Sequence, residues 1–115
     1  MKKILIIGAG AMGSAFAIPC LDNNNKVTLS EPYNFKLLKK ILSKKRFHPA
    51  LKLNLPKKLT IKKFSSELLI DKWDLIVIAV SSVGINSIRE SLKKLKSNCP
   101  VLILTKGLKY DRNKK

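Results

Sequence analysis

The sequence predicts an α/β fold whose mostly parallel sheet is doubly wound, and three observations support this. Short apolar segments alternate along the chain with segments of helical periodicity. The first of these segments, residues 2–7, contains the unbroken apolar run Ile4-Leu5-Ile6-Ile7, which is typical of a parallel strand covered on both faces. A glycine run follows it directly, with Gly8, Gly10 and Gly13, and a helical segment comes next. This order indicates a Rossmann-type domain.

The N-terminal half is expected to contain two strands and two helices. After the strand at 2–7, residues 11–21 form a helix that Pro19 is expected to kink or shorten by a turn. A second strand covers 27–31, and apolar residues recur with helical spacing over 33–45. Residues 46–58, which include Pro49 and Pro56, are expected to form a loop.

The C-terminal half repeats the alternation. Residues 59–64 are expected to form a short edge strand, and 65–70 a brief helix. Residues 74–80 read as a buried strand, 84–96 as an amphipathic helix and 101–105 as another buried strand. The chain turns polar at Lys106, so we expect one domain over 1–109 and a disordered tail over 110–115.

The chain is strongly basic. It carries 24 Lys and Arg against 7 Asp and Glu, a formal charge of +17. Such an excess attracts anions in general, including nucleic acid. However, 21 of the basic residues are lysines spread along the chain, and aromatic residues make up only 6%. Because base recognition favours arginine and stacking aromatics, a nucleic-acid partner is not expected.

Cysteine usage and the N-terminus indicate the compartment. Cys20 and Cys99 do not form a disulfide framework, and the first residues lead straight into a strand without a secretory signal. We therefore expect a cytoplasmic protein with reduced thiols. No apolar run approaches the roughly 20 residues that cross a bilayer, so no membrane span is expected.

The glycine run has the spacing of a dinucleotide-binding loop. Gly8 permits a tight turn after the strand, Gly10 removes a side chain where backbone must approach a pyrophosphate, and Gly13 lets the helix pack close to the strand. The N-terminus of the following helix then offers free amides and a positive dipole end to the phosphates. The predicted cofactor is a nicotinamide dinucleotide.

Glu31 ends the second strand, 18 residues after Gly13. A carboxylate there can accept hydrogen bonds from both hydroxyls of the adenosine ribose, and its charge repels a 2′-phosphate, which favours NAD over NADP. The alternative is a solvated loop glutamate. The nearby Lys36, Lys39 and Lys40 could soften the discrimination, so the choice between NAD and NADP stays open.

Other candidate residues follow the later strands. The hydroxyls of Ser81 and Ser82 could line the nicotinamide ribose, or one of them could cap the next helix. Lys106 leaves the last strand at the carboxyl edge, where ligands bind, and could hold an anionic group of substrate or coenzyme. His48 is the lone histidine, and it lacks the partners that a metal site needs.

Together these features resemble the N-terminal coenzyme domain of NAD(P)-dependent glycerol-3-phosphate dehydrogenase. The resemblance runs from residue 1 to about 109 and rests on the glycine run, the segments 46–53 and 74–82, and Thr105-Lys106-Gly107-Leu108. It implies that Ala11, Met12 and Lys106 match coenzyme-contacting positions, and that Lys106 also matches a substrate-contacting one. The implied reaction is hydride transfer between NAD(P)(H) and glycerol-3-phosphate or dihydroxyacetone phosphate.

The sequence departs from that family in several places. The family usually has an aromatic residue in place of Met12, often serine in place of Ala11, and proline in place of Ser81. The family's helical C-terminal domain, with its catalytic lysine, is absent from these 115 residues, so no catalytic residue is assigned. We expect the chain alone to bind coenzyme weakly, to turn over little or nothing, and to use a small phosphorylated substrate only with such a domain.

Two alternatives stay open at this point. Residues 8–14 also look like ketopantoate reductase, but that family ends its fifth strand in an asparagine-glycine turn and carries a lysine soon after the fourth. A non-catalytic NAD-binding module is the other alternative.

Overall fold

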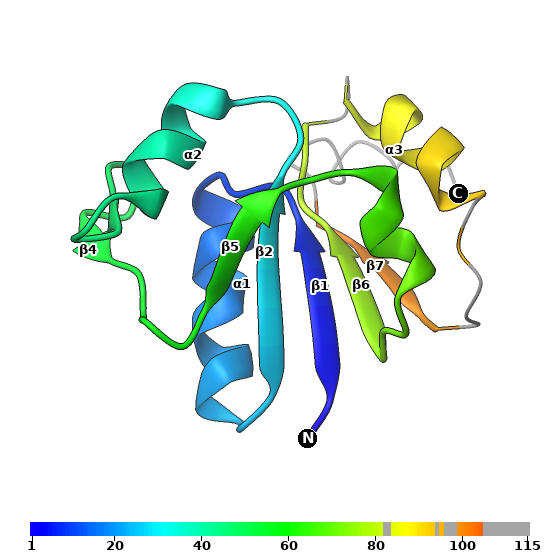
Figure 1. Cartoon of the computed structure of the whole chain (residues 1–115), viewed down its shortest axis with the longest axis horizontal. Helices are drawn as coiled ribbons and strands as arrows, with labels where there is room; N and C mark the ends of the chain where they lie inside the picture. The colour runs from blue at the N-terminus through cyan, green and yellow to red at the C-terminus, as the bar shows by residue number, and fades with distance from the viewer. Residues whose placement is uncertain (82–83, 94, 96–98, 105–115) are drawn as a thin grey trace, which may run out of the picture.

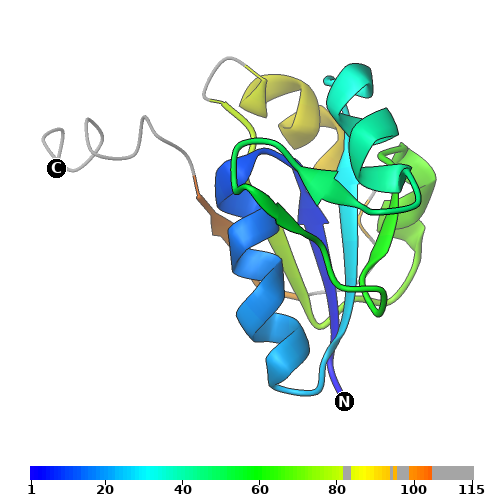
Figure 2. The same cartoon turned by 90° about the vertical axis from the view of Figure 1, so that its left-hand side faces the viewer.

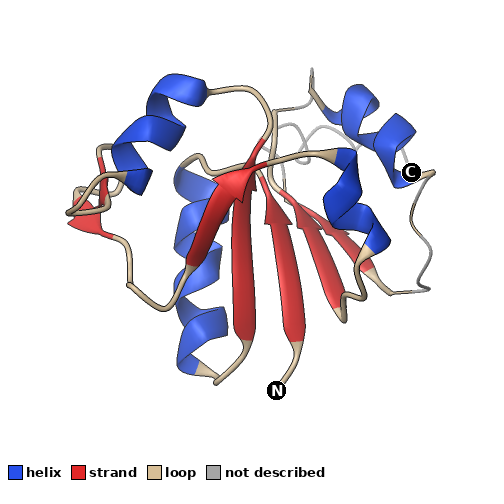
Figure 3. Ribbon diagram, in the orientation of Figure 1, coloured by secondary structure: helices blue, strands red, loops and turns tan. Residues whose placement is uncertain are grey.

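A five-stranded parallel sheet forms the centre of the computed structural model, which describes residues 1–81, 84–93, 95 and 99–104. The strand order is β5-β2-β1-β6-β7, and the arrows all point the same way in Figure 3. The strands are β1 (Lys3–Ile7), β2 (Lys26–Glu31), β5 (Thr60–Lys63), β6 (Leu75–Ile78) and β7 (Val101–Ile103). This confirms the predicted Rossmann-type α/β fold.

Helices cover both faces of the sheet. They are α1 (Ala11–Asp22), α2 (Phe35–Leu42), the 3-10 helix η1 (Ser66–Ile70) and α3 (Ile85–Leu92). Figure 1 shows α2 beside β5, and Figure 2 shows α1 and η1 on opposite sides of the sheet. Along β1, Ile4 and Ile6 join the core under α1 and α2, whereas Leu5 and Ile7 join the core under η1 and α3. The apolar side chains of β1 therefore pack into the hydrophobic cores on both faces of the sheet.

The segment between α2 and β5 differs from the expected loop. It contains a two-stranded antiparallel hairpin, β3 (Phe47–His48) and β4 (Leu53–Asn54). Arg46 enters it with a positive φ of 53°, and its Nη1 donates to the carbonyls of Pro56 and Leu59 at 2.7 and 2.6 Å. These contacts are made between residues distant in sequence, so local residue preferences did not reveal the hairpin.

Three predictions about helices need correction. Helix α3 ends at Leu92 rather than at residue 96, and the Lys93 N–H donates to the Glu90 carbonyl three residues back. Helix α1 runs through Pro19 to Asp22 and is not shortened. Pro19 and Ala15 are both exposed, so water can reach the part of the helix where the Ala15 carbonyl loses its helical partner. Helix α2 is shorter than expected because Ser43 adopts an extended conformation with a ψ of 170°, and its hydroxyl donates to the Lys40 carbonyl at 2.6 Å.

Strand β7 was predicted to be buried, but it is partly exposed. The exposed fractions of Val101 and Leu102 in β7 are 39% and 40%. Strand β7 lies at the edge of the sheet in the described residues, so its outer side has no neighbouring strand there. By contrast, β5 is an edge strand as predicted.

Two described ionisable groups have shifted pKa values, one half-buried on α1 and one exposed after η1. Burial raises the pKa of the Cys20 thiol on α1, and Cys20 and Cys99 are both free and half-buried. A hydrogen bond from Lys3, 3.1 Å away, lowers the pKa of the Asp71 carboxyl. Within the described ranges, no helix is both long enough and apolar enough to cross a membrane.

Candidate dinucleotide-binding site

The glycine loop joins β1 to α1 at the carboxyl edge of the sheet. Gly8 has a φ of +115°, which side-chain-bearing residues rarely adopt, and a Cβ there would lie 2.6 Å from the Ala79 carbonyl oxygen. A Cβ on Gly13 would overlap the Gly8 carbonyl oxygen. In contrast, a Cβ on Gly10 would meet no atom within 4 Å. The chain's own packing therefore requires glycine at 8 and 13, whereas the space over Gly10 is open.

Open space continues over the first turn of α1. Gly10 is the N-cap residue and has no side chain with which to cap the helix. Ala11 and Met12 are exposed, and the first turn carries no acidic side chain. Unbonded N–H groups and a positive dipole end at such a terminus suit an anion. The exposed surface of Gly10, Ala11 and Met12 could therefore receive a phosphate group.

The sheet topology places this loop at the point where strand order reverses. Strands β2 and β5 lie on one side of β1, and β6 and β7 lie on the other. In open α/β sheets, ligands bind outside the carboxyl ends of the strands at such a point. Glu31 ends β2 and Ser81 follows β6, so both lie at this same edge, on either side of the glycine loop.

Glu31 is buried, with an exposed fraction of 5%, rather than solvated as the alternative interpretation held. Its Oε1 accepts a hydrogen bond from the Ala9 N–H at 2.7 Å. Its Oε2 accepts from the N–H groups of Tyr33 and Asn34, both at 2.9 Å. A carboxylate offers about four acceptor positions. Three are therefore occupied by the chain itself, which leaves one for another donor.

His48 also reaches the glycine loop, which the sequence did not indicate. It lies on β3 with an exposed fraction of 1%, and its Nε2 is 2.8 Å from the Ala9 carbonyl oxygen. The hairpin brings it there across 39 residues of sequence. No sequence pattern could have found this contact, because it depends on how the hairpin folds back over α1 and the loop.

A tyrosine bridges the two sides of this edge. The Tyr33 hydroxyl donates to the Gly84 carbonyl at 2.8 Å, and a Cβ on Gly84 would lie 2.6 Å from the Tyr33 ring. Gly84 is the N-cap residue of α3, so the prediction that Ser81 caps this helix is wrong. Ser81 is exposed at the end of β6. Ser82, the other serine that could have capped this helix, lies outside the described residues. Thr105, Lys106 and Leu108 also lie outside them.

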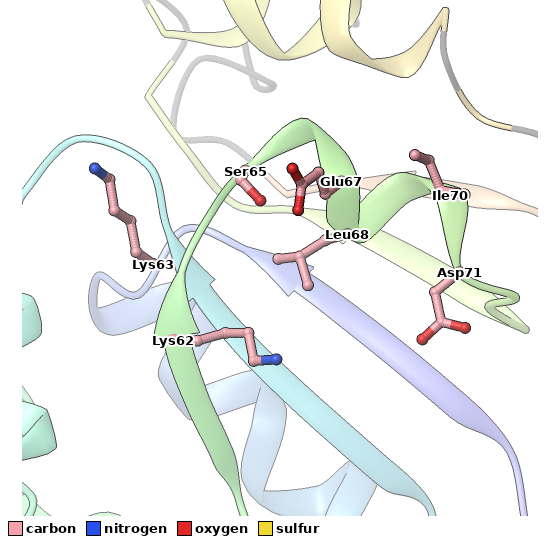
Figure 4. A pocket seen from close by; sticks show the side chains of 7 residues that line it. All are labelled: Lys62, Lys63, Ser65, Glu67, Leu68, Ile70 and Asp71. Atoms are coloured by element: carbon pink, nitrogen blue, oxygen red, sulfur yellow. The ribbon is translucent and has the colours of Figure 1, made fainter.

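One hollow in the described part of the chain lies apart from this loop, between β5 and η1 (Figure 4). Its volume is about 760 Å³, and it is lined by Lys62, Lys63, Ser65, Glu67, Leu68, Ile70 and Asp71. None of the predicted site residues that the structure describes lines it. In the described part of the chain, no three His, Cys, Asp or Glu side chains are grouped to hold a metal ion.

Comparison with known proteins identifies a family. The model of the family described as NAD-dependent glycerol-3-phosphate dehydrogenase N-terminus matches residues 3–115. A glycerol-3-phosphate dehydrogenase [NAD(P)+] of Protochlamydia amoebophila is 36% identical, across 96% of this chain and 33% of the relative. The Wigglesworthia glossinidia brevipalpis enzyme of the same name is 37% identical, across 92% of this chain and 32% of the relative.

A solved structure has the same fold. Glycerol-3-phosphate dehydrogenase from Coxiella burnetii superposes with a TM-score of 0.74 at 22% identity, across 92% of this chain and 33% of that one. At this identity the likeness shows the fold alone. The chain spans about a third of the length of the curated relatives it matches.

Proposed function

Because this chain belongs to the family of NAD-dependent glycerol-3-phosphate dehydrogenase N-termini, we propose that it supplies the coenzyme-binding part of such an oxidoreductase. The observation that carries the proposal is the contrast within the glycine loop. Packing demands glycine at positions 8 and 13, but nothing in the described chain fills the space over Gly10. A glycine beside open space at a helix N-terminus is explained by a ligand that approaches its backbone.

The proposed coenzyme site extends along the carboxyl edge of the sheet. The backbone from Gly10 to Gly13, including Ala11 and Met12, receives the pyrophosphate, with Gly8 and Gly13 shaping the turn. The free acceptor position of Glu31 takes a hydroxyl of the adenosine ribose. Ser81, exposed after β6, faces the nicotinamide ribose.

Lys106 is the proposed contact for an anionic group of substrate or coenzyme. It follows Leu104 by two residues in the sequence, and the Leu104 N–H donates to the Ile78 carbonyl at the carboxyl edge, at 2.7 Å. The nicotinamide supplies the hydride chemistry when it is bound. Residues of this chain bind and orient the coenzyme, and no group among them is proposed as the acid that protonates the substrate.

The reaction proposed for the whole protein is reversible hydride transfer between NAD(P)(H) and glycerol-3-phosphate or dihydroxyacetone phosphate. It requires residues beyond the third of the family's length that this chain spans. We propose a coenzyme domain over residues 1–109, followed by the tail at 110–115.

Titration of the chain with NADH tests the proposal directly. We expect saturable binding of one molecule per chain, with a dissociation constant of roughly 0.1–1 mM, because only part of the coenzyme surface is covered. Calorimetry would measure it, with adenosine as a control that lacks the pyrophosphate. The chain alone is expected to show no steady turnover of dihydroxyacetone phosphate. The absence of saturable NADH binding would contradict the coenzyme role. Steady turnover by the chain alone would contradict the proposal that the reaction requires residues beyond this chain.

Coenzyme preference is proposed to depend on the charge of Glu31. Its buried carboxylate disfavours a 2′-phosphate, so the Glu31→Gln variant is expected to improve the ratio of NADPH to NADH affinity by about tenfold. If the substitution also loosens the loop, the binding of NADH and of NADPH is weakened alike, and this effect cancels in the ratio of the two affinities. The matched control is Glu67→Gln on η1, an exposed glutamate that lines the separate hollow between β5 and η1. An unchanged ratio in Glu31→Gln would assign the preference to other residues, Lys36, Lys39 and Lys40 first.

A further inference from the structure

The backbone of Ala9 is held by three side chains from three different elements. Its N–H donates to Glu31 Oε1 on β2 at 2.7 Å. Its carbonyl oxygen accepts from His48 Nε2 on β3 at 2.8 Å, and from Ser14 Oγ on α1 at 2.9 Å. Ala9 and Ser14 have no exposed surface. Both backbone polar groups of this buried loop residue, which belong to two successive peptide units, are thus bonded to side chains rather than to another strand.

The contacts of His48 indicate which of its ring nitrogens donates. Nε2 lies against a carbonyl oxygen, which only accepts, so this contact requires the tautomer with a proton on Nε2. The other ring nitrogen, Nδ1, lies 3.4 Å from the Leu51 backbone nitrogen. The backbone carbonyl of His48 accepts from the Lys52 N–H at 2.8 Å, which holds the residue in the hairpin.

Glu31 connects the same loop residue to the next helix. Its second oxygen accepts from Tyr33 and Asn34, and the Asn34 side chain in turn accepts from the Leu37 N–H and caps α2. A buried carboxylate is tolerated only where donors surround it, and here backbone N–H groups do so. The position of α2 and the position of the glycine loop are therefore coupled through one side chain.

We propose that Glu31, His48 and Ser14 are positioning residues that clamp the backbone N–H and carbonyl of Ala9 and hold the loop from Gly8 to Gly13 in its pyrophosphate-binding conformation. The inference rests on the proposed function. Glycine-rich backbone loses much conformational entropy when it is ordered, so a clamp that orders it before binding raises affinity. The clamp has a specific consequence for coenzyme binding. Because the Ala9 N–H already donates to Glu31, the N–H groups that bind the pyrophosphate are those from Gly10 onward.

The test compares two substitutions of His48. The His48→Gln variant places an amide N–H near the original Nε2, whereas His48→Leu has a similar volume and no donor. We expect His48→Leu to raise the NADH dissociation constant about tenfold, and His48→Gln to restore most of the affinity. Amide hydrogen exchange of the 15N-labelled chain without coenzyme provides the second measurement. The Ala9 amide is expected to exchange at least tenfold faster in His48→Leu than in wild type, while the amide of Ile76 in β6 is unchanged.

The two measurements separate the clamp from the coenzyme role. If wild type shows slow Ala9 exchange and His48→Leu speeds it, but NADH binds to neither protein, the clamp stands and the proposed function fails. If Ala9 exchange and NADH affinity are both the same in His48→Leu as in wild type, the clamp is overturned. Should His48→Leu not fold, Ser14→Ala replaces it, because that change removes only one hydroxyl from the same carbonyl. We expect Ser14→Ala to raise the NADH dissociation constant and the exchange rate of the Ala9 amide by about threefold each. No change in either quantity would overturn the clamp.

Discussion

Replacing Gly13 with alanine is expected to lower the free energy of unfolding by about 3 kcal/mol or more. The added methyl would overlap the Gly8 carbonyl oxygen and lie 3.1 Å from the Ala79 Cβ. Both belong to packed backbone or short side chains that cannot rotate away, so α1 must move off the sheet. Urea denaturation followed by circular dichroism would measure the loss as a lower midpoint with an unchanged slope.

Gly10→Ala is the matched control for Gly13→Ala. It adds the same methyl to the same loop, where it meets no atom within 4 Å, and Gly10 has a φ of −65° that alanine adopts freely. We expect its unfolding free energy to stay within about 0.5 kcal/mol of wild type. If Gly13→Ala proved as stable as Gly10→Ala, the close approach of α1 to the Gly8 carbonyl would not exist in solution.

The Gly10→Val variant is expected to fold as wild type and to lose NADH binding. Gly10 has extended backbone angles, which a β-branched residue tolerates. Its larger side chain would instead fill the open space that the proposed pyrophosphate occupies. The expected change is at least a hundredfold rise in the dissociation constant, about 2.7 kcal/mol, with the urea midpoint almost unchanged. Calorimetry and denaturation on the same sample measure the two quantities.

A partner other than a dinucleotide would respond differently to Gly10→Val. A nucleic-acid ligand attracted by the net charge of +17 would bind in a salt-dependent way and independently of position 10. Salt-sensitive binding of duplex DNA that survives Gly10→Val, combined with NADH affinity equal to wild type, would show that the loop is not the ligand site.

Local sequence was sufficient to predict most of the sheet. The expected strands at 2–7, 27–31, 59–64 and 74–80 correspond to β1, β2, β5 and β6 with ends shifted by a residue or two. The segments at 2–7 and 74–80 contain unbroken apolar runs, and those at 27–31 and 59–64 begin with apolar residues at alternate positions. Burial and periodicity therefore indicate them without knowledge of the partners. Helix ends were less predictable. The short run of α2 depends on Ser43, whose hydroxyl bonds the Lys40 carbonyl instead of continuing the helix.

The sequence by itself determined the fold through the alternation of strand and helix segments and the glycine spacing, because only a residue without Cβ fits between a strand and a helix packed so closely. Tertiary structure decided how the loop is held. Glu31 looked like a ribose ligand from its position at a strand end, but its carboxylate bonds three backbone N–H groups first. His48 looked like an isolated loop residue, but it is buried against Ala9. The contacts that Glu31 and His48 make with Ala9 join residues more than twenty positions apart. The geometry of such pairs is set by packing, and no local pattern of residues encodes it.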